Sequence, residues 1–326
     1  MRALVTGATG KVGHAVASAL LERGDEVRAL LRAGRKAAIL PAGAEPALGD
    51  VTDTASVRRA AEGCELVFNA MGLPEQWLSD EETFERVNAR GSETVVRAAA
   101  EAGARRVVHT STIDVFHAAP GARFDEAQLA DYPKGTAYER SKQRGEELAL
   151  AAAAETGMEL VVVNPAAVYG PGPSGSASFE RQLFKPLVDG RRLEAPALPP
   201  GGCGVVFTKG IGRGQLLAAE RGQPGERYIL CDRHVSIREL AEEVVRVAGR
   251  GRVPPTLPPA VARAMASGGE LLARVMRKPP VLSRGQLYFF LWNAAPDSGR
   301  AERELGWEPT PLDDGLRATL AGMGLV

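Results

Sequence analysis

The sequence predicts an α/β fold, a doubly wound parallel sheet with helices on both faces and a smaller C-terminal α/β part. Short apolar runs of strand length alternate with helical patterns along the first half of the chain. No hairpin signal separates these runs, so consecutive strands need crossover connections, which are right-handed in parallel sheets. A glycine-rich turn joins the first strand to the first helix. These three observations together predict the fold class.

The glycine-rich turn contains Gly7, Gly10 and Gly13, after an apolar strand at residues 3–5 and before a helix that ends near Gly24. Gly7 permits a turn that a Cβ would obstruct, and Gly10 lets the backbone approach a pyrophosphate. Gly13 lets the helix pack closely on the strand, and the free N–H groups of the helix then face the anion. The pattern predicts a dinucleotide-binding Rossmann domain; the alternative is an ordinary tight turn.

The second strand, at residues 27–31, ends at Arg32. In dinucleotide-binding folds a carboxylate at this position accepts hydrogen bonds from the ribose 2′-hydroxyl, whereas an arginine suits a 2′-phosphate. The chain has no carboxylate here, and Arg35 and Lys36 follow. We therefore predict NADP as the cofactor, with NAD as the alternative; Arg35 and Lys36 are alternatively solvated helix charges.

The elements that follow continue the alternation. Asp53 or Thr54 is a suitable cap for a helix after residues 48–51, because both side chains can accept from free N–H groups of a first turn. Gly103 suits the end of a long helix. In order, we expect a strand at 66–70, a helix at 80–102, a strand at 106–109, a helix at 137–155 and a strand at 160–163.

Hydroxyl side chains follow the 106–109 strand at Thr110, Ser111 and Thr112. Ligands bind outside the carboxyl ends of strands in such sheets, so this end is a candidate site. Tyr138 and Lys142 are four residues apart and project from one face of their helix. A nearby ammonium favours the phenolate and lowers the tyrosine pKa toward neutrality, where acid–base catalysis is effective. The pair alone is weak evidence, but it follows the glycine turn and the hydroxyl cluster in the required order.

With these parts in place, the chain resembles an extended short-chain dehydrogenase/reductase. It is similar to the NAD(P)-dependent epimerase/dehydratase superfamily, in its 3β-hydroxysteroid dehydrogenase-like and dihydroflavonol reductase-like branch. Residues 6–13 match the cofactor loop, residues 109–115 resemble the motif of the catalytic hydroxyl, and residues 164–172 match a loop that closes over the nicotinamide. Asn88 lies in a segment that resembles Asn-Val-x-Gly-Thr, and residues 300–309 match a tail motif.

The resemblance implies roles for individual residues. Thr112, with Ser111 as the alternative, holds the substrate oxygen; Tyr138 is the proton donor or acceptor; and Lys142 binds the nicotinamide ribose and tunes Tyr138. Together with Arg32, the expected cofactor-binding residues are Gly7, Thr9, Gly10, Lys11, Val12, Gly13, Asp50, Val51, Asn69, Ala70, Met71, Lys142, Pro165 and Val168. No metal site is expected.

Prolines and glycines become frequent after Pro165. We expect residues 1–165 to form the NAD(P)-binding domain and residues 166–326 the substrate-binding part, with an approximate boundary because the chain crosses between them. The resemblance departs at residues 208–213, where an acidic pair is missing, so we expect an altered loop there. A strand at 225–230 and a helix at 237–248, capped by Ser236, follow.

Two apolar stretches in the second half have two interpretations. Residues 287–292 are rich in aromatic side chains, and residues 260–276 form an amphipathic helix with Met265, Leu271, Leu272 and Met276. They are either a lid and wall for an apolar substrate or a weak membrane contact, or else ordinary core, which we favour slightly.

Composition narrows the class of protein. Forty basic residues balance forty acidic ones, so no overall field attracts nucleic acid or a membrane. The three cysteines form no C-x-x-C motif, and no apolar run approaches the ~20 residues of a membrane span. The N-terminus reads as a core strand and not as a signal peptide. We therefore expect a cytoplasmic protein that acts on a small molecule.

We predict an NADP-dependent oxidoreductase that interconverts a ketone and a secondary alcohol. Sugar dehydratases of the resembled superfamily carry a pair of acidic residues directly after the catalytic threonine. Here Ile113 follows Thr112 and only Asp114 is acidic, which disfavours an elimination reaction. The alternatives are a sugar-nucleotide or related epimerase that holds NAD tightly and, ranked lower, a dinucleotide sensor without turnover. We also expect a homodimer through the helices at 80–102 and 137–155, whose alanines would permit close approach.

Overall fold

A computed structural model describes residues 1–35, 37–74, 77–78, 80–175, 178–190, 197–276 and 280–326, without the side chains of residues 274 and 275. Its centre is a seven-stranded sheet in which every neighbouring pair is parallel. In spatial order the strands are β10 (Arg227–Leu230), β7 (Glu159–Pro165), β5 (Arg106–Thr110), β4 (Leu66–Asn69), β1 (Arg2–Thr6), β2 (Glu26–Leu31) and β3 (Glu45–Leu48). The predicted parallel sheet is confirmed.

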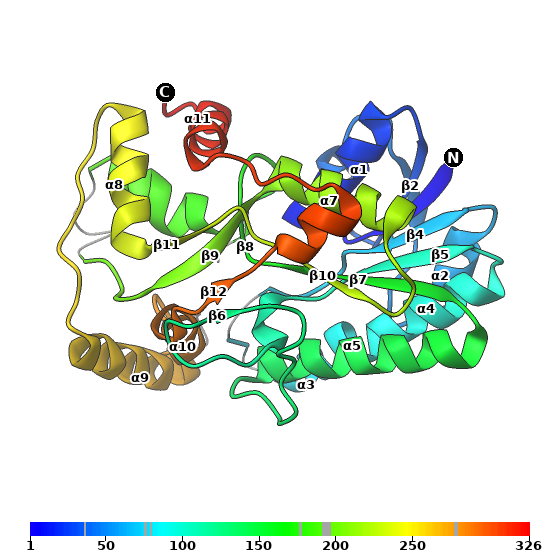
Figure 1. The fold of residues 1–326 in the computed structure, drawn as a ribbon, viewed down its shortest axis with the longest axis horizontal. Coiled ribbons are helices and arrows are strands. Elements are labelled where there is room, and N and C mark those ends of the chain that lie inside the picture. Colours follow the sequence, from blue (N-terminus) through cyan, green and yellow to red (C-terminus); the bar gives the residue numbers. More distant parts are fainter. Residues whose placement is uncertain (36, 75–76, 79, 176–177, 191–196, 277–279) are drawn as a thin grey trace.

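Helices cover both faces of this sheet (Figure 1). On one face α1 (Lys11–Glu22) packs against α7 (Thr208–Arg221), and both contribute to one hydrophobic core. On the other face α2 (Thr54–Ala61), α4 (Gly91–Glu101) and α5 (Ala137–Thr156) form a second core. The arrangement is the Rossmann architecture expected from the alternation of strands and helices.

Local capping chemistry explains several boundaries. The side chain of Asp53 accepts a hydrogen bond from Ala55 N at the start of α2, so Asp53 and not Thr54 is the cap. The predicted helix at 80–102 comprises α3 (Glu82–Phe84), a π-helical segment, η2 (Glu85–Arg90), and α4. It ends before Gly103, whose φ of +78° is the conformation that glycine adopts most readily.

The second half builds a smaller layer beside the main sheet. Strands β11 (Arg233–Ser236), β9 (Gly202–Phe207) and β8 (Ala167–Tyr169) form a three-stranded sheet, and β12 (Ala295–Pro296) pairs with β6 (Arg123–Phe124). The helical elements here are η4 (Glu180–Phe184, π-helical), α6 (Lys185–Val188), α8 (Ile237–Ala248), α9 (Pro259–Met276), α10 (Arg284–Trp292) and α11 (Leu312–Gly322). Short single-turn helices lie at η1 (Ala37–Ile39), η3 (Ile113–Val115) and η5 (Ala301–Leu305). Ser236 caps α8 as predicted, by accepting from Glu239 N.

The chain does cross between the two parts. Strand β10 comes from the second half yet joins the main sheet beside β7, with Arg227 opposite Val162. The division at residue 165 stays a prediction.

The expectation of an altered loop at residues 208–213 is wrong. Helix α7 begins at Thr208 and includes the whole segment. A Cβ on Gly212 would lie 2.7 Å from the carbonyl oxygen of Ala15. Glycine therefore allows α7 to lie directly against α1, and this packing offsets the low intrinsic helix propensity of glycine.

We predicted that alanines of the helices at 80–102 and 137–155 would permit close approach of a second copy, and this is wrong for four of them. Ala98 and Ala99 of α4, and Ala149 and Ala152 of α5, are fully buried within the chain's own core. They mediate the packing of α4 and α5 on each other and on the sheet. The homodimer itself stays a prediction.

We slightly favoured residues 260–276 as ordinary core, and the structure shows that this is wrong for the four large apolar residues named in that segment. Met265, Leu271, Leu272 and Met276 are all more than half exposed. Leu287 of the aromatic stretch is buried as expected, whereas Tyr288 is exposed. In the described part of the chain, no helix is both long enough and apolar enough to cross a membrane.

Candidate functional site

The glycine turn forms a close-fitting backbone loop at the carboxyl end of β1. Gly7 has a φ of +71°, and a Cβ there would lie 2.5 Å from the carbonyl oxygen of Ala70. A Cβ on Gly13 would lie 2.4 Å from the carbonyl oxygen of Gly7. Both positions therefore need glycine, for the turn and for the close approach of α1 to β1.

The N-terminus of α1 is open to an anion. Its N-cap residue, Gly10, is extended and supplies no side-chain hydrogen bond, and the first turn carries no acidic residue. The first N–H groups of a helix lack intrahelical partners and carry the positive end of its dipole. This end of α1 therefore fits a pyrophosphate.

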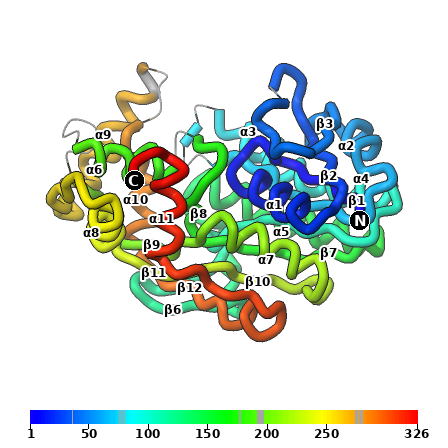
Figure 2. Tube along the Cα trace, turned by 90° about the horizontal axis from the view of Figure 1, so that it is seen from above, coloured from blue at the N-terminus to red at the C-terminus, as the bar shows by residue number. Residues whose placement is uncertain are grey.

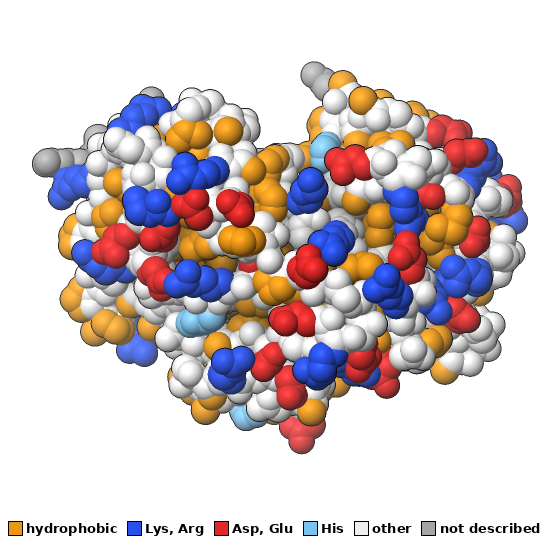
Figure 3. Space-filling model, turned by 45° about the horizontal axis from the view of Figure 1, so that its top comes forward, with side chains coloured by type: hydrophobic (Ala, Val, Ile, Leu, Met, Phe, Trp, Pro, Cys, Tyr) orange, Lys and Arg blue, Asp and Glu red, His pale blue; other side chains and the backbone are white. Residues whose placement is uncertain are grey.

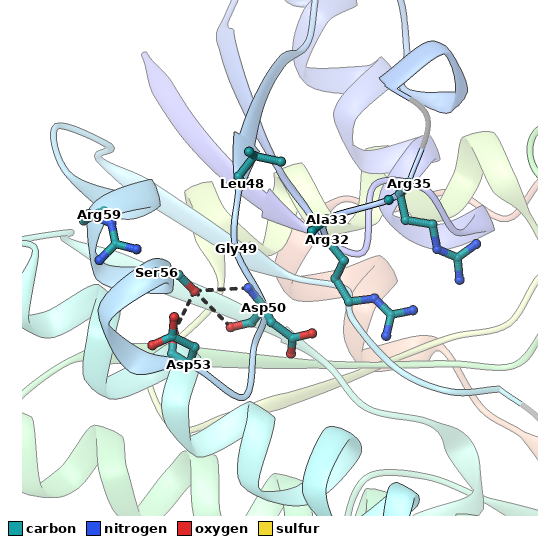
Figure 4. Close-up of a pocket in the computed structure, with 10 residues that line it drawn as sticks. Arg32, Ala33, Arg35, Leu48, Gly49, Asp50, Asp53, Ser56 and Arg59 are labelled. Atoms are coloured by element: carbon teal, nitrogen blue, oxygen red, sulfur yellow. Dashed lines mark hydrogen bonds between the residues drawn. The ribbon is translucent and has the colours of Figure 1, made fainter.

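A cavity of about 660 Å³ lies at the ends of β2 and β3. Arg32, Arg35 and Arg59 line it, with Asp50 and Asp53. Figure 4 shows the Arg32 and Arg35 guanidinium groups on the same side of this cavity, with Arg59 on the opposite side, on α2. Arg59 is not among the residues predicted from the sequence, and Lys36 lies outside the described residues. Two guanidinium groups that line one cavity suit a phosphate ester.

A second cavity, of about 540 Å³, runs from the glycine turn past the carboxyl ends of the strands. It brings together almost all of the predicted site residues. Its lining includes Gly7, Thr9, Gly10, Lys11, Val12, Arg32, Asp50, Val51, Ala70, Met71, Thr112, Tyr138, Lys142, Pro165 and Val168.

Two predicted residues do not line this cavity. Gly13 lies behind the turn, where it permits the packing described above. The amide of Asn69 accepts from the hydroxyl of Thr6 at 2.8 Å and lies 3.1 Å from Nδ1 of His109. Asn69 thus ties three neighbouring strands together below the site.

The predicted catalytic side chains converge at the middle of the cavity. Lys142 is buried, and its ammonium donates to the carbonyl oxygen of Thr110 at 2.8 Å. Burial lowers the pKa of Lys142 to about 8, and the charges of Glu146 and Asp114 oppose that shift. Tyr138, one turn earlier, is half-buried, and its ring makes a T-shaped contact with the ring of Phe84. A buried ammonium one turn from a phenol favours the phenolate.

The two candidate hydroxyls differ in their partners. The hydroxyl of Thr112 donates to Oδ2 of Asp114 at 3.2 Å. The hydroxyl of Ser111 is buried, lines the cavity and has no hydrogen-bond partner within the described structure. Because buried polar groups are normally satisfied, Ser111 is a candidate contact for a ligand.

Asn88 supports this arrangement from the π-helical segment η2. Its side chain accepts from Leu73 N at 2.8 Å and donates to the hydroxyl of Ser141 at 3.1 Å. It therefore joins the loop after β4 to the helix that carries Tyr138 and Lys142.

Asp114 is a buried carboxyl on the cavity wall. Its pKa is raised to about 7, mainly by burial and also by the charge of Glu139, while the charge of Lys134 opposes the shift. The carboxyl therefore changes charge near neutral pH, in contact with Thr112.

We expect the free energy of unfolding of the wild type to fall, relative to Asp114→Asn, as pH rises from about 4 to about 7. A carboxyl whose pKa is raised on folding stabilises the fold when protonated, and that contribution is lost as pH rises to the folded pKa. The difference between the two proteins should change by at most about 1.4 kcal/mol per pH unit and level off above pH 7. Urea unfolding at several pH values measures it, and a difference independent of pH contradicts the prediction.

Lys11 connects the glycine turn to the second half of the chain. Its ammonium donates to the carbonyl oxygen of Gly170 at 2.8 Å and pairs with Glu180 at 2.7 Å. Glu180 is buried and also accepts from Gly170 N. Sequence reasoning missed Glu180, because no motif marks a carboxylate that is 169 residues away from its partner.

Comparison with known proteins places this geometry in a family. The model of the NAD-dependent epimerase/dehydratase family matches residues 3–196. The chain belongs to the NAD-dependent epimerase/dehydratase family. As a member of this family of extended short-chain dehydrogenases/reductases, it is an NAD(P)-dependent oxidoreductase.

Relatives of this epimerase/dehydratase family member cover nearly its whole length. It is 32% identical to sterol demethylase protein B from Methylococcus capsulatus, over 95% of this chain and 94% of the relative. It is 33% identical to a Stigmatella aurantiaca protein, 4-hydroxy-2-methyl-3-oxo-4-farnesyl-3,4-dihydroquinoline-1-oxide ketoreductase, over 94% of this chain and 92% of that one. UDP-glucose 4-epimerase from Thermotoga maritima shares the fold, with a TM-score of 0.79 and 20% identity over 99% of each chain.

Proposed function

We propose that the protein is an NADP-dependent reductase that interconverts a ketone and a secondary alcohol, with Tyr138 as the acid and base. One observation carries the proposal: Tyr138, Lys142, Thr112 and the glycine turn line a single cavity that reaches Arg32. Its lining runs from the glycine turn and Arg32 to Phe289 and Phe290, so one cavity could hold a dinucleotide and a substrate together.

Each residue has a distinct role in the proposed reaction. Thr112 or Ser111 holds the carbonyl oxygen of the substrate, and Tyr138 donates a proton to that oxygen. Lys142 stabilises the resulting phenolate and holds the ribose. The reduced nicotinamide, when bound, supplies the hydride that forms the new C–H bond on the carbonyl carbon. The reverse reaction returns the proton to Tyr138.

We propose an apolar substrate. Phe179, Phe289 and Phe290 line the cavity together with Gln182 and Gln286, so its far end joins aromatic rings to a few amide groups. An apolar wall with few polar groups is typical of a site for a lipophilic small molecule. The names of two relatives, a sterol demethylase protein and a reductase of a farnesylated quinoline oxide, agree with this class.

An epimerase that retains NAD is the second candidate, because the family includes enzymes of that kind and the catalytic residues would be the same. A sensor without turnover ranks lower, because Tyr138 and Lys142 both face the cavity. The first experiment is to denature freshly purified protein and identify any released dinucleotide by mass. NADP, or an empty protein that binds NADPH more tightly than NADH, supports the reductase, whereas stoichiometric NAD favours the epimerase and contradicts the role of Arg32.

Arg32→Asp should reverse the preference between the two cofactors. The substitution removes a guanidinium from the 2′-phosphate and introduces a carboxylate that repels it and accepts from a 2′-hydroxyl. We expect NADPH affinity to fall by roughly 10- to 100-fold, as for loss of a hydrogen bond to a charged group, while NADH affinity is kept or improved. Fluorescence titration of both cofactors measures it. Arg59→Asp, on the opposite side of the same cavity, should lower NADPH affinity less than Arg32→Asp does. An unchanged NADPH affinity in Arg32→Asp contradicts the assignment.

A further inference from the structure

Exposed hydrophobic side chains gather in one segment of the protein. Of the thirteen large hydrophobic residues that are exposed in the described part of the chain, seven lie between residues 261 and 288. Five of them are on α9 and one, Tyr288, is on α10. Single exposed hydrophobic residues are ordinary, but a cluster of this kind marks an interaction site.

Four of these residues share one side of α9. Val261, Met265, Leu272 and Met276 follow helical spacing and are between 45% and 58% exposed. The other apolar side of the helix is buried, because Ala262 and Ala266 pack against Leu287 of α10. Helix α9 thus has more apolar surface than its contact with α10 covers. We call these four residues the α9 stripe.

The segment that carries the α9 stripe has a net positive charge, which favours an anionic partner. Residues 259–286 contain five arginine or lysine residues and one glutamate, whereas the chain as a whole has equal numbers of basic and acidic residues. That glutamate, Glu270, is buried and pairs with Arg284 at 2.7 Å, while Arg263 is exposed. Of the five basic residues, Arg277 and Lys278 lie outside the described residues, and the side chain of Arg274 is not described. By contrast, the face in Figure 3 carries interspersed acidic and basic side chains.

Helix α9 lies at the outer edge of the molecule, beside the helix that forms the cavity wall (Figures 1 and 2). Helix α10 packs on α9 through Leu287 and directs Phe289 and Phe290 into the cavity. Tyr288, between these positions, is 51% exposed. One short helix therefore connects the exposed apolar surface to the proposed substrate site.

We propose that the α9 stripe docks on the surface of a membrane that contains anionic lipids. Amphipathic helices with an apolar face and arginines on the polar face lie in the plane of the lipid interface, and each basic residue near an anionic surface adds to the attraction. A second copy of the chain fits less well, because a twofold interface would place the same basic residues opposite one another. Docking would place the cavity beside α10 next to the bilayer, so that an apolar ketone dissolved there could enter it; this consequence rests on the proposed function.

The test is co-sedimentation of the full-length protein with vesicles of phosphatidylcholine, with and without phosphatidylglycerol. We expect the wild type to bind the vesicles that contain phosphatidylglycerol and to bind less as salt is added. Leu272→Glu combined with Met276→Glu should reduce the bound fraction by roughly tenfold or more. Val326→Glu, at an apolar residue that is equally exposed elsewhere, should leave binding unchanged. All three side chains are more than half exposed, so each variant should keep the wild-type Tm.

Three results would overturn the proposal. They are a wild type that does not sediment with anionic vesicles, a double variant that sediments like the wild type, and a wild-type dimer that the double variant converts to monomer in light scattering. The third result would make a second copy the occupant. Turnover of a water-soluble ketone with NADPH should be equal in wild type and double variant. Absence of turnover in both would contradict the proposed function, while vesicle binding would still report on the stripe.

Discussion

Replacement of Tyr138 by phenylalanine will lower turnover by roughly 10²- to 10⁴-fold, which is the range for loss of a positioned acid or base. The substitution removes one oxygen and keeps the ring that makes the T-shaped contact with Phe84. Cofactor affinity and thermal stability should therefore stay near the wild-type values. The measurement is kcat with a reducible apolar ketone, together with NADPH titration. Unchanged turnover would remove Tyr138 from the mechanism.

Alanine substitutions of the two hydroxyl residues provide the comparison for Tyr138→Phe. If Thr112 holds the substrate oxygen, Thr112→Ala should reduce kcat more than Ser111→Ala does. The opposite order would assign that role to Ser111, whose hydroxyl is buried without a partner in the described structure.

Gly13→Ala will lower the free energy of unfolding by about 3 kcal/mol, the upper part of the range for overpacking. The added methyl group would lie 2.4 Å from the carbonyl oxygen of Gly7 and 2.5 Å from its carbon. Both are backbone atoms, so no side-chain rotation relieves the contact, and α1 must move away from the turn. Because the turn supports the proposed pyrophosphate site, dinucleotide affinity should fall by roughly tenfold or more. Urea unfolding and NADPH titration measure the two effects.

Gly268→Ala is the matched control. Gly268 lies within α9, and a Cβ there would meet nothing within 4 Å. Alanine has a higher helix propensity, so this variant should gain up to about 1 kcal/mol. Equal effects at the two positions would show that the cost at Gly13 is not the contact with Gly7.

The first half of the fold was predictable because local patterns determine it. Strand and helix periodicity, together with caps such as Asp53, predicted the elements around the glycine turn. Thr112 was predictable because ligands bind outside the carboxyl ends of parallel strands, and Tyr138 and Lys142 were predictable because residues four apart share one face of a helix. The structure places all three on one cavity.

What the sequence did not predict depends on contacts between distant segments. Glu180 pairs with Lys11 only because the second half of the chain folds back over the turn. The glycines at the start of α7 suggest a loop in the sequence, and only the close packing of α7 on α1 explains why this segment is helical. Likewise, the periodicity of α9 shows an apolar face but not how much of that face a neighbouring helix covers, so its exposure required the structure.

The position of β10 also affects the order in which the chain can fold as it is synthesised. Its residues, Arg227–Leu230, are made long after β7, Glu159–Pro165, whose outer edge they complete. Until then the nascent chain has six strands of the main sheet, and the edge of β7 presents unpaired backbone groups, the kind of surface that joins other chains into aggregates. The segment that defines the family, residues 3–196, ends before this strand. A chain released early by the ribosome would therefore carry the recognisable motifs but lack the seventh strand of the sheet.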